Sequence, residues 1–581
     1  MNDVKITLQD AYKTSTYDQD KIMSPEDTVA KFKGRLQSAQ LDILDHTERI
    51  DNGRLDIPVF FSVCGEDARQ VIGNKKQMGK GASPSQAEAS AIMELAERFS
   101  FFSFCQNPAH FTLGTYADLK KDALPFEAIA LSVHDTTGDL EAARRVFESI
   151  PMRWTRAWNL TAGHEVLIPF DWFYAINEFN GPSAGNCQEE ALSQGICEIV
   201  ERHVSSIVSH QKRKTPAIDP ASANDAMVQA MLQKYQRNGI RIYVQDFSLD
   251  VGIPTVGVFA YDPTTFPGTS ELVWTAGTTP SPEKAFSRSL TEVAQLAGDF
   301  NSGANYVASG LPKYTRLDQA AFLMEPEATV RLDTLPDLSN DNIRIEVENL
   351  VNALAGRDLE VLVIDTMHPH LEIPAFYTIV PGTHFRERAQ GTSVGMFSAK
   401  LVVENQPPEI ALAELEKFDR LLPERYYIQF YMGLSRLNAG RPEEALENFN
   451  RALELDPEEE DIPSIYSYLG VCLKDTGRYR EALDVLNRGL AVDNERTDLH
   501  NLKGFCHFQL KEHEEAIRAF KNVIRLNPAS AIDYANVASN YRDLDRHEDA
   551  IRYYRMALEI DPSIEFARDN LARLTGNPPA S

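Results

Sequence analysis

Acidic side chains recur at helical spacing in the segment 185–203, together with one amide side chain. At about 100° per residue in an α-helix, one narrow arc would carry Glu190, Gln194, Glu198 and Glu201. The opposite side of that helix would be apolar and would suit a protein core. Carboxylates packed this closely repel one another and take up protons unless multivalent cations neutralise them. The segment therefore predicts either a divalent metal site in a cleft or a solvated acidic helix face.

Two further segments, 90–98 and 288–295, have the same design and narrow these alternatives. Each would place its polar residues on one face of a helix, with apolar residues on the buried flank. These residues are Ser90, Glu94, Glu97 and Arg98 in the first segment and Arg288, Glu292 and Gln295 in the second. Mg²⁺ prefers oxygen ligands and bridges phosphate oxygens, and arginine pairs with phosphate as a planar donor. The three helices together predict a site for a metal–polyphosphate complex.

The three segments resemble the nucleotide-binding signature of the YcaO superfamily, and the resemblance extends over residues 20–400. In the segment 90–98, the pattern SxxxExxER matches Ser90, Glu94, Glu97 and Arg98. In the segment 185–203, Asn followed by EAxxQxxxExxER matches Asn186, Glu190, Ala191, Gln194, Glu198, Glu201 and Arg202. In the segment 288–295, RxxxExxQ matches Arg288, Glu292 and Gln295. No polar position of the three patterns is substituted. The resemblance implies ATP- and Mg²⁺-dependent activation of a peptide backbone amide.

The resemblance also implies roles for individual residues. The metal ligands would be Glu94, Glu97, Glu190, Glu198, Glu201 and Glu292, although which carboxylate binds which ion is left open. The transferred phosphoryl group would be steadied by Arg98, Arg202 and Arg288. Further contacts to ATP would come from Lys21, Thr28, Lys80, Ser90, Asn186, Gln194, Arg202, Arg288 and Gln295.

Two of the expected nucleotide contacts rest on short matches. Lys21 and Thr28 have the seven-residue spacing of a lysine and a hydroxyl residue that lie near the nucleotide in this family. The alternative is an exposed lysine and an ordinary threonine near a helix start at Ser24. Lys80 lies between two glycines in the segment 73–83, which we interpret as a loop. This segment lacks the P-loop spacing GxxxxGK[ST], so only the family resemblance supports Lys80.

The predicted fold is an α+β YcaO-type domain with mixed sheets and helices. Strands are expected at 57–64 and within 151–178, and two similar β units at 240–261 and 359–381. The expected domain boundaries are an N-terminal segment at 1–60, a catalytic core at 61–405, a linker helix at 406–423, and a repeat region at 424–576.

The repeat region is predicted from small residues at a regular interval. Gly433, Gly470, Gly504 and Ala538 are separated by 37, 34 and 34 residues. A period of 34 residues with two helices is typical of tetratricopeptide repeats, which form an all-α solenoid. The sequence therefore predicts four repeats and a capping helix at 563–576.

Composition and charge indicate in which cellular compartment the protein works and which classes of partner it is suited to bind. With 58 basic and 85 acidic side chains, the chain carries a net charge of −27 and has no basic run, which disfavours nucleic-acid binding. It has no apolar run long enough to cross a membrane, and its six cysteines form no CxxC pair. We expect a cytoplasmic protein with reduced thiols.

The family's reaction leaves the product open. A nucleophile adds to a backbone carbonyl, and ATP phosphorylates the resulting oxygen so that it leaves as phosphate. The nucleophile decides the product: a substrate side chain yields an azoline, sulfide yields a thioamide, and an amine yields an amidine. Azoline-forming members typically end in PxPxP, whereas this chain ends Gly-Asn-Pro-Pro-Ala-Ser. The sequence therefore favours thioamidation or an accessory role in ribosomal-protein methylthiolation. The alternatives are an azoline-forming cyclodehydratase and a non-catalytic ATP-binding scaffold.

The repeats indicate a protein partner. Stacked tetratricopeptide units form a groove suited to an extended peptide, so we expect them to recruit a peptide or protein substrate or a sulfur-transfer partner. Repeats that only join two copies are the alternative, and the family resemblance also leaves a homodimer open.

Overall fold

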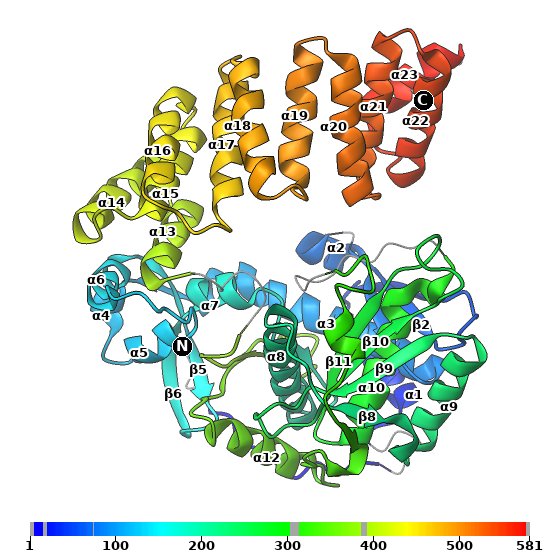
Figure 1. Cartoon of the computed structure of the whole chain (residues 1–581). Coiled ribbons are helices and arrows are strands. Elements are labelled where there is room, and N and C mark those ends of the chain that lie inside the picture. The colour runs from blue at the N-terminus through cyan, green and yellow to red at the C-terminus, as the bar shows by residue number, and fades with distance from the viewer. Residues whose placement is uncertain (1–4, 15–19, 74, 303–312, 385–391, 577–581) are drawn as a thin grey trace. The chain divides into compact units, whose positions relative to one another are not determined.

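The computed structural model describes residues 5–14, 20–73, 75–302, 313–384 and 392–576 (Figure 1). The chain forms two compact units. The first consists of Met1–Thr136 and Pro151–Thr392, and the second of Thr137–Ile150 and Ser393–Ser581. The units therefore part ahead of residue 405, where the sequence suggested a boundary. Among the described residues, no helix combines the length and the apolar character that a membrane span requires.

The described part of the first unit forms three β-sheets. Their strand orders are β1-β2-β3, β11-β10-β9-β8-β12, and β4-β5-β13-β14-β7 with β6 paired to β5. The strand bounds are β1 Leu44–Arg49, β2 Val59–Cys64, β3 Gln77–Lys80, β4 Thr112–Gly114, β5 Met152–Asn159, β6 His164–Pro169, β7 Pro182–Ala184, β8 Ala217–Asp219, β9 Arg241–Asp246, β10 Thr255–Tyr261, β11 Val273–Thr278, β12 Thr329–Arg331, β13 Leu362–Asp365 and β14 Ala375–Ile379. Most neighbours are antiparallel, but β8 and β12 are parallel. The predicted mixed-sheet α+β fold is confirmed.

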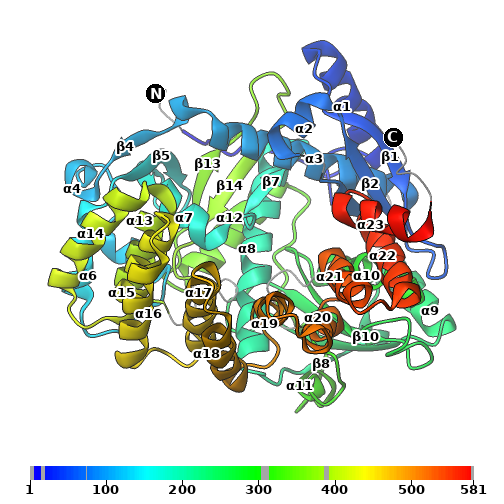
Figure 2. The ribbon, with the colours of Figure 1, turned by 90° about the horizontal axis from the view of Figure 1, so that it is seen from above.

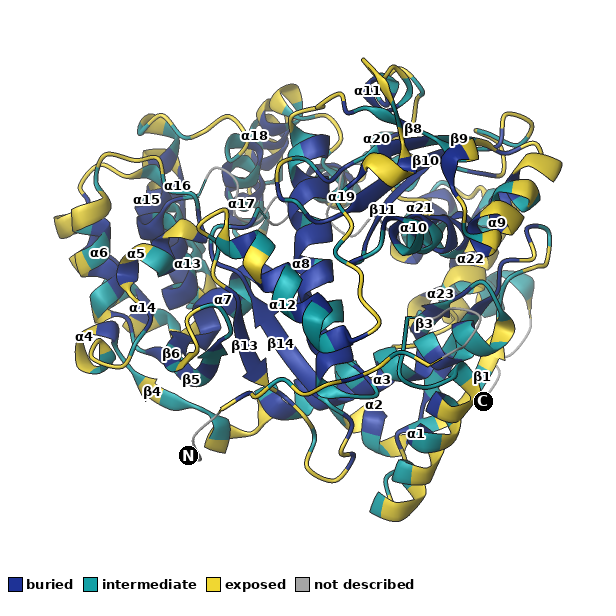
Figure 3. Cartoon of the chain, turned by 90° about the horizontal axis from the view of Figure 1, so that it is seen from below, coloured by how far each residue is buried: buried dark blue, intermediate teal, exposed yellow. Residues whose placement is uncertain are grey.

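The helices of the first unit cover these sheets. Their bounds are α1 Pro25–Ala39, α2 Glu66–Ile72, α3 Pro84–Gln106, α4 Tyr116–Leu119, α5 Phe126–Leu131, α7 Phe170–Asn177, α8 Gln188–His210, α9 Ala226–Arg237, α10 Pro282–Ala297, α11 Ala321–Met324 and α12 Ile343–Ala355. The three polar segments of the sequence lie on α3, α8 and α10. Helix α8 runs between two sheets, touching β7 and β14 on one side and β11 on the other (Figure 2). It is buried along most of its length (Figure 3).

The two β units expected from the sequence are antiparallel strand pairs in different sheets. In β9 and β10, Asp246 faces Val256, and in β13 and β14, Asp365 faces Phe376. The expectation for 170–177 was wrong, because this segment is helix α7. Its residues are mostly buried, and an apolar run buried on all sides carries no periodicity that separates a helix from a strand.

The second unit is helical. Its bounds are α6 Leu140–Ser149, α13 Val394–Asn405, α14 Pro408–Leu421, α15 Tyr426–Asn438, α16 Pro442–Glu454, α17 Ile462–Asp475, α18 Tyr479–Val492, α19 Thr497–Gln509, α20 His513–Leu526, α21 Ala531–Asp543, α22 His547–Ile560 and α23 Glu565–Thr575. The helices α15 to α22 form four consecutive pairs, and α23 follows them (Figure 1). A Cβ atom on Gly433 would lie 2.8 Å from the Phe449 ring, so the small residue of the repeat is required where paired helices cross. The predicted solenoid is confirmed.

Candidate nucleotide and metal site

A cavity of about 420 Å³ lies in the first unit and is large enough for a small ligand. It is lined by all sixteen residues that the sequence singled out: Lys21, Thr28, Lys80, Ser90, Glu94, Glu97, Arg98, Asn186, Glu190, Gln194, Glu198, Glu201, Arg202, Arg288, Glu292 and Gln295. They come from α1, α3, α8, α10 and β3, and from the segments before α1 and α8. The structure thus brings together residues that are up to 274 positions apart, from Lys21 to Gln295.

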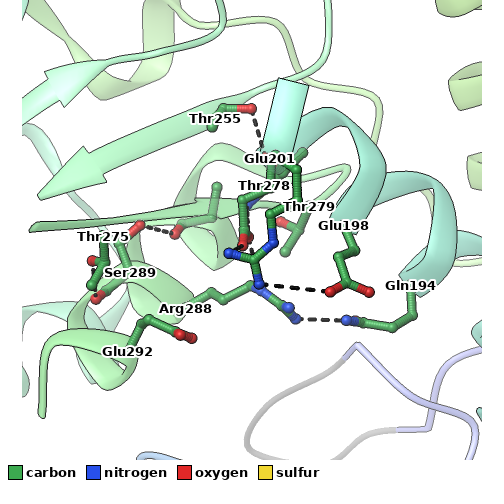
Figure 4. A network of polar contacts seen from close by, with 12 residues as sticks. Gln194, Glu198, Glu201, Thr255, Thr275, Thr278, Thr279, Arg288, Ser289 and Glu292 are labelled. Atoms are coloured by element: carbon green, nitrogen blue, oxygen red, sulfur yellow. Dashed lines mark hydrogen bonds and ion pairs between the residues drawn. The ribbon is translucent and has the colours of Figure 1, made fainter. Parts of the chain in front are cut away.

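Helix α8 supplies the central wall of the cavity. Glu190, near its start, accepts hydrogen bonds from the backbone N–H groups of Ile22 (2.7 Å) and Asn186 (2.9 Å). One turn further, the Gln194 amide oxygen accepts one from Arg288 Nη1 (3.0 Å). Figure 4 shows Arg288 reaching from α10 toward Gln194. This contact joins the second and third motifs.

Arg288 also contacts the carboxylate of Glu201, which lies deeper along the same face of α8. Its Nε lies 3.3 Å from Glu201 Oε2, and the N–H of Thr278 donates to the same oxygen over 3.3 Å (Figure 4). Arg202 lies 3.6 Å from Glu198 and 3.9 Å from Glu201. Two guanidinium groups therefore share the acidic face of α8.

A close backbone approach fixes where this acidic face lies. Gly195 lies on the side of α8 that packs against β7 and β14. A Cβ atom at this position would lie 2.4 Å from Thr378 Oγ1 and 2.7 Å from Ser183 Oγ. Only glycine lets the helix pack this closely, and Gln194 and Glu198 extend into the cavity from the adjoining part of the helix.

Helix α3 forms the facing wall. Arg98 lies 3.8 Å from Glu94 and 3.5 Å from Glu97. Burial raises the pKa of Glu94 and raises the pKa of Glu97 further still; Glu198 across the cavity acts in the same direction, while Arg98 opposes it. The carboxylates on the two walls thus repel one another, as expected for side chains placed to share cations.

Lys80 enters from strand β3, within the segment that the sequence interpretation treated as a loop. That expectation was wrong, and the glycines explain why. A Cβ atom on Gly79 would lie 2.0 Å from the Ala91 nitrogen and 2.3 Å from the Ala87 oxygen of α3. Gly79 therefore serves close packing, and the alternation along the strand turns Met78 and Lys80 to the cavity.

The Lys80 ammonium group pairs with Glu292 of α10. Burial lowers the pKa of Lys80 to about 7, with Arg288 adding to the effect and Glu201 and Glu94 opposing it. Lys80 therefore joins strand β3 to the third motif, as Arg288 joins the second motif to the third.

Lys21 and Thr28 line the cavity as well. The Thr28 hydroxyl accepts a hydrogen bond from the Asn186 side chain (2.9 Å), which connects α1 to the start of α8. Burial lowers the pKa of Lys21, but Asp20, Glu190 and Glu346 outweigh it, so the pKa is raised and the side chain stays charged. The two residues that rested on a short match therefore face the same space as the three motifs.

Other cavity residues escaped the sequence interpretation. Lys13 and Glu346 form an ion pair in the wall, Lys284 pairs with Asp225, and the segment from Thr278 to Ser281 contributes the edge of β11. Lys284 lies on α10, one turn before Arg288, so helical spacing could have indicated it. Lys13 and Glu346 carry no comparable signal, because neither belongs to a spaced polar pattern.

The donor set suits Mg²⁺ and a polyphosphate, although the carboxylates are not gathered around one point. The described residues contain no group of three or more acidic, histidine or cysteine side chains arranged to hold an ion. Arg98, Arg202, Arg288 and Lys80 neutralise the carboxylates instead. Within the described chain, Gln295 Oε1 and Arg202 Nε are buried without a hydrogen-bond partner. An unpaired acceptor and an unpaired donor in the walls fit a ligand that brings both cations and phosphate oxygens.

The α+β fold and the carboxylates, arginines and lysines that line its cavity together indicate a protein that binds a nucleotide with a metal ion. A family model described as YcaO cyclodehydratase, ATP- and Mg²⁺-binding, matches residues 78–384, and the chain belongs to the YcaO family. Three tetratricopeptide models match residues 426–495, 497–530 and 534–564. ATP and Mg²⁺ are therefore the ligands of this family domain, and the sequence-based identification is confirmed.

Two relatives illustrate how far the likeness extends. An uncharacterized protein of Methanothermobacter thermautotrophicus is 28% identical over 380 residues, which cover 62% of this chain and 93% of the relative. The ribosomal protein S12 methylthiotransferase accessory factor YcaO of Escherichia coli is 27% identical over 310 residues, 49% of this chain and 50% of the relative. The chain thus spans about half the length of that accessory factor.

Two solved structures share the fold. YcaO from Methanopyrus kandleri bound with AMPPCP and Mg²⁺ is 22% identical, with a TM-score of 0.51, covering 65% of this chain and 95% of that one. A heterocyclase in complex with substrate and cofactor is 24% identical, with a TM-score of 0.53, covering 66% and 55% respectively.

Proposed function

We propose that the first unit binds ATP with Mg²⁺ and uses it to phosphorylate the oxygen of a peptide backbone carbonyl. One observation carries this proposal: every polar residue of the three motifs is intact and lines one cavity. A degenerate nucleotide-binding scaffold would be free to lose these carboxylates and arginines. Their retention as buried charges, which is costly unless a ligand uses them, supports a catalytic role.

The proposed reaction proceeds in three steps. A nucleophile adds to the carbonyl carbon, and the resulting oxygen then attacks the γ-phosphorus of ATP, which releases ADP. The phosphorylated oxygen finally leaves as inorganic phosphate, while the added sulfur or the amide nitrogen loses its proton and forms the new double bond to carbon. With sulfide as the nucleophile the amide becomes a thioamide; with a side chain of the substrate it becomes an azoline.

The chain's own residues would stabilise the charge that moves during this transfer. Arg98, Arg202 and Arg288 surround the acidic walls and can donate to phosphate oxygens, which arginine does in a fixed planar geometry. Glu94, Glu97, Glu190, Glu198, Glu201 and Glu292 would hold the cations. The cations held there would offset the negative charge of the triphosphate.

We favour non-azoline chemistry, either thioamidation or an accessory role in methylthiolation of a ribosomal protein. The relative named as a methylthiotransferase accessory factor supports this choice. The fold shared with a heterocyclase supports the alternative, an azoline-forming cyclodehydratase. The products differ in mass: replacing oxygen by sulfur adds mass to the substrate, whereas ring closure with loss of water removes it.

The repeats would recruit the polypeptide substrate or a sulfur-transfer partner. The exposed apolar side chains of the second unit include Phe505 on α19 (37%), Ile532 on α21 (45%) and Phe566 on α23 (39%), which lie on every second helix. Exposed apolar residues repeated in this way are suited to an extended peptide. Removing the repeats is therefore expected to reduce modification of the cognate target far more than basal ATP hydrolysis.

The test is ATP turnover by the purified full chain. Hydrolysis is expected with Mg²⁺ and to vanish in excess chelator, and Glu198→Gln or Glu201→Gln should abolish it without changing the melting temperature by more than a few degrees. Glu88→Gln is the matched control, because Glu88 lies on α3 outside the cavity and pairs with Lys33. Full activity of both cavity variants, or in chelator, would disprove the assignment.

A further inference from the structure

An N-terminal strap, residues 5–14, which the family motifs do not include, contributes Lys13 to the lining of the cavity. Ala11 N donates to the Asn342 side chain (3.0 Å), Ile343 N donates to Ala11 O (2.8 Å), and Lys13 N donates to Asp341 O (2.9 Å). The strap is thus bound along the start of α12. Its residue Gln9 is also bound to the first turn of α8 through Glu189 (2.7 Å).

This arrangement places a buried ion pair in the cavity wall. Lys13 Nζ lies 2.5 Å from Glu346 Oε1, and the two side chains are only 13% and 5% exposed. The Asn340 N–H donates to the same oxygen over 3.0 Å. Within the described residues, Oε2 of Glu346 accepts no hydrogen bond. Because Glu346 lines the cavity, a ligand bound there can donate hydrogen bonds to this carboxylate.

The chemistry of the surrounding wall distinguishes this place from the phosphate site. The six carboxylates and three arginines of α3, α8 and α10 belong to the metal–polyphosphate region. The lining of the cavity also includes apolar side chains: Met23, Pro25, Met227 and Ile343, the last of which the strap binds through Ala11 O. A nucleoside has apolar ring faces and a few polar groups, so the apolar part of the lining suits the nucleoside and the charged part suits the phosphates.

The negative charge of Glu346 does not suit a phosphate group, and its pairing with Lys13 leaves no charge for a metal ion to neutralise. A carboxylate repels phosphate oxygens, and Lys13 already neutralises the charge of Glu346. Two adjacent hydroxyl groups, as on a ribose, offer the donors that an ionised carboxylate accepts, a pairing also used by dinucleotide-binding proteins.

We propose that Glu346 accepts hydrogen bonds from the ribose hydroxyls of the bound nucleotide, with Lys13 as the residue that positions it. The inference rests on the proposed function, because it assumes that the phosphates occupy the motif residues. It identifies the strap as part of the nucleotide site, so that the nucleoside is held by segments outside the three motifs.

The test compares three Mg²⁺-loaded probes by calorimetry on the full chain: ATP, 2′,3′-dideoxy-ATP and inorganic tripolyphosphate. Wild type is expected to bind ATP on the order of tenfold more tightly than the dideoxy compound, the effect of hydrogen bonds to a charged group. Glu346→Gln is expected to weaken ATP binding by most of that factor and to leave tripolyphosphate binding unchanged. Glu348→Gln, on the same helix but outside the cavity, is the matched control and should bind all three probes as wild type does.

Two results would overturn the inference. Either Glu346→Gln keeps the wild-type preference for ATP over the dideoxy compound, or it loses ATP and tripolyphosphate in the same proportion. If Glu346→Gln does not fold, Lys13→Met is used instead, with the same selective loss expected. Wild type that binds neither ATP nor tripolyphosphate would contradict the proposed function itself, which separates the two failures.

Discussion

The tight contact at Gly195 makes the first prediction. Replacing Gly195 by alanine introduces one methyl group between α8 and the strands β7 and β14. That group would lie 2.4 Å from Thr378 Oγ1 and 2.7 Å from Ser183 Oγ, well inside contact distance. Since both neighbours are buried in the sheet, the helix must shift, and with it Gln194, Glu198 and their partners.

Two opposing effects decide the size of the change. Alanine is the better helix former and would gain up to about 1 kcal/mol over glycine in a helix interior. Overpacking a close-packed core costs about 1–3 kcal/mol. We therefore expect a net loss of about 1–2 kcal/mol, which lowers the melting temperature by roughly 1–4 °C for a unit of this size. The affinity for ATP should fall as well, because α8 carries four of the predicted site residues in its acidic stripe.

The assay is thermal unfolding together with calorimetric ATP binding, and α1 offers a matched control. Gly34 lies in that helix with no atom within 4 Å of an added Cβ, so Gly34→Ala should stabilise the protein and leave ATP binding unchanged. The double variant Gly195→Ala with Thr378→Ala removes the nearest clash and should recover part of the loss. If Gly195→Ala stabilises the protein as Gly34→Ala does, and ATP binds normally, the close approach of α8 is wrong.

Two further predictions concern pH and domain division. Burial, with His134 and His210 nearby, lowers the pKa of His384 to about 4. Below about pH 6.5 the unfolded chain takes up a proton at this residue that the folded chain does not, so the free energy of unfolding falls as the pH falls from 6.5 toward 4. The melting temperature of His384→Gln should therefore decline less steeply than that of wild type between pH 7.5 and 4.5, and an unchanged slope would contradict this. A chain cut after residue 423 should melt at a higher temperature and aggregate less than one cut after residue 405, because α14 covers α6 and α13. Sedimentation that shows more aggregation of the longer chain would refute this prediction.

The acidic helices could be predicted because their signal is local. Glu190, Glu198 and Glu201 repeat at helical spacing, and an apolar flank on the same segment fixes which face is buried. The tetratricopeptide repeats were equally accessible, since each repeat buries its small residues against its own partner helix. The placement of the motif residues in one cavity follows from these helices once they pack on their sheets.

The strap could not be predicted in the same way, because it is defined by long-range pairing. Lys13 meets Glu346 across 333 positions of sequence, and neither residue stands in a repeated pattern. Helix α6 posed a similar problem. Its buried face, with Ala143, Val146 and Phe147, predicts an amphipathic helix but not its partner, which is the helical unit that resumes at residue 393.

The glycines near the site show how a pattern can be found and yet misinterpreted. Gly79 and Gly81 suggested a flexible loop around Lys80, because glycine is common where the backbone must bend. In the structure they lie against α3, and an added Cβ atom on Gly81 would come within 2.6 Å of the Ala87 nitrogen. The same residue type that permits bending also permits close packing, and only the packing partner distinguishes them. Since Gly79 and Gly195 set how closely β3 and α8 approach their neighbours, they determine whether Lys80 and Glu198 reach the same cavity. The intact polar motif is thus necessary for this site, but the small residues beside it control its geometry.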